Sequence, residues 1–190
     1  MPVRPTKTPF TGNADADQLL TDNPLALILG MLLDQQVPME WAFGAPALLR
    51  ERLGGTLDAP TIAKMTPEDL EAIFRAKPAL HRYPGNMAKR VQELCALVAS
   101  EYGGDASRLW SEARDADDLE RRIRVLPGFG DMKVKALGSV LAKRLGVAAA
   151  EPLVPPHPTL GDVDSVEALE AYQAAKRAHK RALRADTAAS

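Results

Sequence analysis

The spacing of apolar residues along the chain predicts helices throughout. Residues 25–33 are almost wholly apolar, which indicates a helix that is buried on all sides. In residues 86–102 the apolar positions recur at intervals of three and four, as they do on one face of an amphipathic helix. No segment alternates apolar and polar residues in the way a half-buried strand does. We therefore expect an all-α fold.

Capping residues, prolines and glycines delimit further helices. These are expected at 39–53, 66–76, 115–125, 132–145 and 164–185. Residues 1–21 should form an N-terminal arm, and 22–125 a helical lobe. Residues 126–146 should form the helix-hairpin-helix unit, and 147–190 a linker and a C-terminal helix that packs on the second lobe. Asp164 is expected to cap that last helix.

The charge of the chain is balanced, with 24 Lys and Arg residues against 25 Asp and Glu residues and a net charge of -1. This balance argues weakly against a nucleic-acid partner. The basic residues nevertheless gather in four clusters, at 75–90, 121–124, 133–144 and 176–184. No long apolar run or secretory signal is present, so a cytoplasmic protein without membrane contact is expected.

Cysteine usage limits the possible cofactors. Cys95 is the only cysteine, which excludes an intramolecular disulfide. It also excludes a zinc or iron-sulfur site held by several thiolates. We expect no metal and no other cofactor.

The most informative segment is the glycine loop, residues 126–130, with the sequence Leu-Pro-Gly-Phe-Gly. Gly128 and Gly130 let the backbone turn sharply and approach a ligand closely. Amides at the start of the next helix can then hold a phosphate, helped by the helix dipole. Lys133 follows in that helix as a further candidate DNA contact. The alternative is an ordinary tight turn between two helices.

Together these segments resemble the helix-hairpin-helix DNA glycosylase superfamily, and in particular a compact bacterial branch of base-excision repair proteins without an iron-sulfur cluster. The resemblance extends to residues 34–42, Asp-Gln-Gln-Val-Pro-Met-Glu-Trp-Ala, and covers roughly residues 22–146. It implies a two-lobed helical bundle with a helix-hairpin-helix motif.

The resemblance also implies roles for three further side chains. Gln36 would enter the duplex near the space left by an extruded base, and Arg82 or Tyr83 would fill the stack from the loop opposite the hairpin. A polar helix end at Gln36 and a plain surface turn at 81–90 are the alternatives.

The catalytic position departs from the superfamily pattern, which has an aspartate about twenty residues after the second glycine. Ala150 stands at that position here and cannot supply a charge. A carboxylate is needed because cleavage builds positive charge on the sugar. Asp162, just before the last helix, is the first candidate. Asp164 and Glu151 are the alternatives, and Asp164 could be a cap alone.

The function implied by the resemblance is a monofunctional DNA glycosylase that acts as a monomer on double-stranded DNA containing a damaged base. Superfamily members that also cut the strand use a lysine two residues after the second glycine. Met132 occupies that position, and Lys133 lies about 100° further around the helix, so lyase activity is not expected. Two alternatives remain, a catalytically silent DNA-binding or damage-sensing module and a helical scaffold for protein partners.

Overall fold

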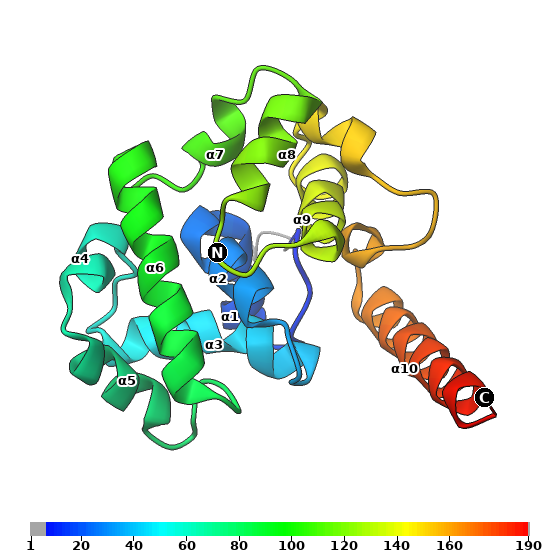
Figure 1. The fold of residues 1–190 in the computed structure, drawn as a ribbon, viewed down its shortest axis with the longest axis horizontal. Helices are drawn as coiled ribbons and strands as arrows, with labels where there is room; N and C mark the ends of the chain where they lie inside the picture. Colours follow the sequence, from blue (N-terminus) through cyan, green and yellow to red (C-terminus); the bar gives the residue numbers. More distant parts are fainter. Residues whose placement is uncertain (1–6, 190) are drawn as a thin grey trace.

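The computed structural model describes residues 7–189, and every regular element within them is helical (Figure 1). The all-α prediction is therefore confirmed for this part of the chain. The elements follow in the order α1 (Ala14–Asp22), α2 (Pro24–Leu33), α3 (Met39–Arg52), α4 (Ala59–Lys64), α5 (Pro67–Arg75), α6 (Pro84–Tyr102), α7 (Arg108–Ser111), α8 (Ala116–Arg124), α9 (Asp131–Lys143), the 3-10 helices η1 (Ala148–Leu153) and η2 (Leu160–Asp162), and α10 (Val166–Ala188).

Helix α2 is the centre of the molecule. Asn23 caps it by accepting the N–H of Ala26, and Pro24 occupies the first turn, where no N–H partner is needed. Every residue of α2 after Pro24 is buried, as its all-apolar sequence predicts. It contacts α1, α3, α6 and α9, so elements from both halves of the chain pack on one helix (Figure 1).

Helix α6 runs along one side of the molecule, and α4 and α5 pack against it. Its apolar face, including Val91, Leu94 and Val98, is fully buried, as the helical spacing predicts. Gly103 ends the helix in the left-handed conformation, with φ 60°. This side of the fold positions the loop that precedes α6.

The other side is built on α8 and α9, which flank the glycine loop. The segment expected to be a linker instead folds back as η1 and η2, both of which pack against α9. Gly161 lies so close to α9 that a Cβ there would come within 2.4 Å of the Ser139 carbonyl oxygen. The close approach requires glycine at this position and holds Asp162 next to α9.

The N-terminal segment differs from the expected arm. Residues 14–22 form α1, which packs on α2 and α3. Phe10 is fully buried, with its ring centre 5.2 Å from that of Phe43, and the Asp17 carboxylate accepts the N–H of Phe10 at 3.1 Å. The Phe10 ring, together with Leu19 and Leu20 of α1, therefore joins this segment to the core. Residues 1–6 of the predicted arm lie outside the described residues.

Helix α10 also differs from prediction. Leu169 is its only buried residue, residues 174–189 are all exposed, and the helix projects from the body (Figure 1). The expected packing on the second lobe is therefore limited to its first turns. Ser165 rather than Asp164 caps the helix, because the Ser165 hydroxyl accepts the N–H of Ala168. Within the described chain no helix is both long enough and apolar enough to cross a bilayer.

Candidate nucleic-acid interface

The turn after α2 presents one of its two glutamines to solvent. Gln36 is exposed and has a φ of 57°, in the left-handed region that side chains other than glycine rarely adopt. Gln35 is held inside the turn, where its Nε2 donates to the Leu32 carbonyl at 2.8 Å and its Oε1 accepts from Arg90 at 3.0 Å. Of the two, only Gln36 is exposed, and strained backbone of this kind concentrates at functional sites.

His81 connects this turn to the loop before α6. The ring is buried, and its Nδ1 accepts the N–H of Tyr83 at 3.0 Å, which places the ring hydrogen on Nε2. Nε2 then donates to the carbonyls of Leu33 and Gln35, each at 3.1 Å. Burial lowers the pKa of His81, the two carbonyls oppose this effect, and the charge of Lys133 adds to it. A neutral imidazole therefore fastens the loop to the turn.

The loop held by His81 presents an aromatic ring and a cation. Tyr83 is 39% exposed, and the Arg82 guanidinium lies 5.5 Å from its ring centre, in cation–π range. Arg82 also lines a groove of about 690 Å³ together with Gln36. The side chains predicted to act as a wedge and as a gap-filling glutamine thus border the same part of the surface.

The glycine loop places its two glycines differently. Gly128 has a φ of 78°, and a Cβ there would lie 3.0 Å from Leu32 Cδ1, so this residue packs against α2. Gly130 has a φ of -100° and begins α9 as its N-cap, with no side chain capping the first-turn amides. Nothing lies within 4 Å of a Cβ at Gly130. The first amides of α9 therefore have no side-chain cap, and Asp131 in the same turn pairs with Arg124. An uncapped helix start next to open space at Gly130 is the kind of place where a phosphate can bind.

Lys133 points into the protein. Its ammonium group donates to the carbonyls of Met31 and Asp34 at the end of α2. Burial lowers the pKa of Lys133, the charge of Asp34 opposes this effect, and the charges of Lys176 and Arg90 add to it. A lysine that caps the carbonyls of another helix is engaged in structure. We accordingly exclude Lys133 from the residues proposed to contact phosphate.

Three segments far apart in sequence thus meet at the end of α2. They are the turn with Gln36, the loop with Arg82 and Tyr83, and the glycine loop with Gly128 and Gly130, each of which the sequence predicts to contact DNA. His81, Lys133 and Arg90 hold them together, since Arg90 binds Gln35 and lies 3.7 Å from the Cβ position of Gly128. Arg90 and His81 were not predicted as site residues, although both belong to the basic cluster at 75–90.

Asp162 is tightly held in η2. Its Oδ2 accepts the N–H of Thr159 at 2.7 Å, and its Oδ1 accepts from Lys143 Nζ at 2.5 Å. Partial burial raises the pKa of Asp162, but the hydrogen bond and charge of Lys143 and the Thr159 N–H together lower it below its usual value. The side chain remains 41% exposed. Asp162 is therefore an accessible carboxylate that stays ionised at neutral pH.

Asp162 lines a cavity of about 860 Å³ that also includes Met132, His157, Tyr172 and Lys176. Met132 comes from the first turn of α9, which no side chain caps. The other two candidate carboxylates, Glu151 and Asp164, are exposed and do not line this cavity. Lys176 lines both the cavity and the groove of Gln36, so the two hollows are neighbours along α10.

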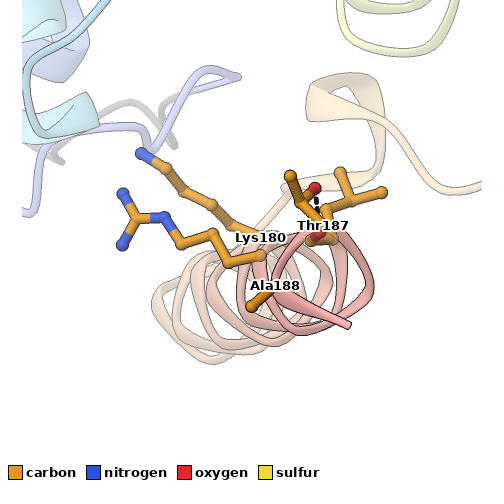
Figure 2. Close-up of a pocket in the computed structure, with 5 residues that line it drawn as sticks. Lys180, Thr187 and Ala188 are labelled. Carbon is orange, nitrogen blue, oxygen red and sulfur yellow. Dashed lines mark hydrogen bonds between the residues drawn. The ribbon is translucent and has the colours of Figure 1, made fainter. Parts of the chain in front are cut away.

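A further surface hollow, the single thiol and the metal-ligating side chains of the described residues do not form a second candidate site. A hollow near the chain end is lined by α10 alone, including Lys180 and Thr187, and is the surface of a single exposed helix (Figure 2). Burial raises the pKa of Cys95 to about 12, with a further contribution from Asp58, so the thiol is a poor nucleophile. Residues 7–189 contain no group of three or more His, Cys, Asp or Glu side chains that could hold a metal ion.

Comparisons with protein-family models, with curated proteins and with solved structures found no match for this chain. The interface residues themselves are therefore the basis for assigning a function.

Proposed function

We propose that this protein is a monofunctional DNA glycosylase of the helix-hairpin-helix type, which flips a damaged base out of duplex DNA and hydrolyses its N-glycosidic bond. The observation that carries the proposal is the meeting of three segments at the end of α2. They bring together the uncapped start of α9 at Gly130, the left-handed Gln36, and the loop with Arg82 and Tyr83. Base flipping needs contacts that hold the DNA backbone, and it needs side chains that fill the space left in the base stack.

Each segment has a task in this proposal. The first amides of α9 bind a backbone phosphate, which fixes the position of the enzyme without reading sequence. Gln36 enters the duplex where the base has left, and its amide can hydrogen bond to the base that remains. Tyr83, with Arg82 beside it, stacks on the neighbouring base.

Asp162 supplies the negative charge for catalysis. The bond from C1′ to the base nitrogen breaks with its electron pair on the base, which takes up a proton. Water adds its oxygen to C1′ and releases a proton. The ionised carboxylate stabilises the positive charge that develops on the sugar. The ammonium of Lys133 is engaged by carbonyls of α2, which disfavours a Schiff base and supports a monofunctional enzyme.

One observation favours a second candidate, a catalytically silent DNA-binding module. Both carboxylate oxygens of Asp162 already have partners, one in Lys143 and the other in the Thr159 N–H. The Thr159 contact is part of a capping box that stabilises η2. The positive charge of Lys143 offsets part of the negative charge of Asp162 that a sugar cation would experience. These contacts would also suit an aspartate with a purely structural task.

The test is excision from duplex oligonucleotides that carry uracil, hypoxanthine, an alkylated purine or an oxidised base, read by alkali cleavage. Asp162→Asn should keep duplex affinity while excision falls on the order of a hundredfold or more, because one preorganised charge is lost. Asp164→Asn is the matched control and should change little, since Ser165 caps α10.

Three other results would change the proposal. If Asp164→Asn abolishes excision and Asp162→Asn leaves it intact, the catalytic assignment is reversed. If both variants excise normally, Glu151 becomes the next candidate. If the unmodified protein binds duplex DNA but releases no base from any of these lesions, the silent module is the better account.

A further inference from the structure

The exposed part of α10 carries a concentrated positive charge. Five cations lie within nine residues, and at 100° per residue they fall within an arc of about 140° on one side of the helix. They are Lys176, Arg177, Lys180, Arg181 and Arg184. All five are exposed, and none of them forms an ion pair with another residue in the 7–189 segment. We call this surface the basic face of α10.

The basic face borders the proposed DNA site. Lys176, Arg177 and Lys180 line the groove of about 690 Å³ together with Gln36 and Arg82. Lys180 extends away from the helix axis in the view along α10 (Figure 2). A duplex that receives Gln36 would therefore lie alongside the basic face.

Acidic residues of the groove do not cancel this charge. Asp34 and Glu40 also line it. The charge of Asp34 acts on the nearby ammonium of Lys133, and the Glu40 carboxylate accepts a hydrogen bond from Gln173 of α10. Three cations of the basic face and Arg82 therefore share the groove with two carboxylates, and Arg181 and Arg184 continue the positive surface beyond it.

Duplex DNA fits this face better than a lipid surface does. From Lys176 to Arg184 the helix rises about 12 Å, which equals the rise of three or four nucleotides of one strand along the duplex axis, at about 3.4 Å each. A helix that binds a bilayer needs large apolar residues opposite its cations. In residues 174–189 Leu183 is the only large aliphatic side chain, and alanine predominates on the rest of the surface.

We infer that the basic face of α10 is a second phosphate-binding element, which holds the DNA strand beside the flipped nucleotide while the glycine loop holds the backbone at α9. The inference rests on the proposed function, because the groove is identified through Gln36. It also accounts for how a chain with a net charge of -1 can hold DNA, since the cations are concentrated where the backbone would pass.

The experiment compares two triple variants of the full chain with the same change in charge. Lys176→Gln/Lys180→Gln/Arg184→Gln removes three cations from the basic face. Lys64→Gln/Arg114→Gln/Arg121→Gln removes three from α4 and from the region of α8, away from the groove. The probe is a duplex with a tetrahydrofuran abasic site, and Kd is measured by fluorescence anisotropy across a series of NaCl concentrations. Circular dichroism and thermal unfolding verify that each variant is folded.

The basic-face variant should bind the duplex at least about tenfold more weakly. The slope of its plot of log K against log [NaCl] should be smaller in magnitude by about two to three, since each neutralised phosphate contributes about 0.9 to that slope. The control variant should keep the slope of the unmodified protein. Equal losses in both variants, or an unchanged slope in the basic-face variant, would overturn the inference while the proposed function stands.

Two further results separate the two proposals. If the unmodified protein does not bind the duplex, the proposed function and the role of α10 fail together. If it binds phosphatidylserine-containing vesicles through the basic face and the basic-face variant still binds DNA normally, the face serves a membrane surface and the inference is wrong.

Discussion

At the scale of single residues, the two glycines of the glycine loop have different structural roles. Gly128 is required by the protein itself, because its φ of 78° is unfavourable for any residue with a Cβ and Leu32 leaves little room for one. Gly130 has an ordinary φ of -100° and open space around it. A side chain at Gly130 would therefore meet a ligand before it met the protein.

Gly130→Ala should weaken duplex binding by about tenfold or more, because its methyl group occupies the space that a phosphate would approach. The free energy of unfolding should fall by less than about 1 kcal/mol, the cost of a poorer N-cap. Gly128→Ala should instead lose about 1 kcal/mol or more of stability through backbone strain. Urea unfolding and anisotropy on the same samples measure both effects. Unaltered affinity in folded Gly130→Ala would remove the glycine loop from the interface.

At the scale of elements, the end of α2 organises the site. The last carbonyls of a helix have no partners within it, and here the side chains of other segments supply them. Lys133 from α9 binds the carbonyls of Met31 and Asp34, and His81 from the loop before α6 binds those of Leu33 and Gln35. Two elements are thereby aligned on the turn that carries Gln36.

The His81 connection should make stability depend on pH. Its pKa in the folded protein is below the ordinary value of about 6.5, so the unfolded chain binds the proton first as pH falls. The stabilisation is complete above about pH 6.5 and is lost as pH falls toward the folded pKa. Urea unfolding of the unmodified protein and of His81→Gln at several pH values from 7 to 5 measures this effect. A pH dependence of equal size in both proteins would show that His81 is not its source.

At the scale of the whole molecule, burial is uneven. Helix α2 is surrounded by helices from both halves of the chain, whereas α10 is exposed from residue 174 onward. A helix without tertiary contacts is marginally stable in water, because packing provides most helical stability in proteins. The free protein thus combines a rigid body with a helix whose second half is supported only by its own hydrogen bonds.

Hydrogen exchange followed by mass spectrometry should show this difference. Amides of α2 should exchange most slowly, near the rate of global unfolding, and those of residues 174–188 should exchange rapidly. Addition of the abasic duplex should slow exchange in α10, if its cations hold phosphates, and leave α4 unchanged as an internal reference. Exchange in free α10 as slow as in α2 would show that another surface covers this helix.

Much of the fold is local in origin and was predictable from sequence. Asn23 and Thr66 cap helices through amides three residues away, and the apolar run of α2 requires burial whatever surrounds it. The position of the glycine loop between two helices follows equally from short-range signals. These features could be predicted because each depends on residues within about one turn of each other.

Features that depend on distant partners needed the tertiary structure. Lys133 was predicted to face DNA, yet it binds a carbonyl 102 residues earlier in the chain. Lys143 and Asp162 meet because η2 folds back on α9, and Phe10 is drawn into the core by Phe43. Sequence by itself determined which helices form and where the chain turns, because those preferences are local. Only the tertiary structure decided which side chains face the groove, since that depends on contacts between segments that no short-range pattern encodes.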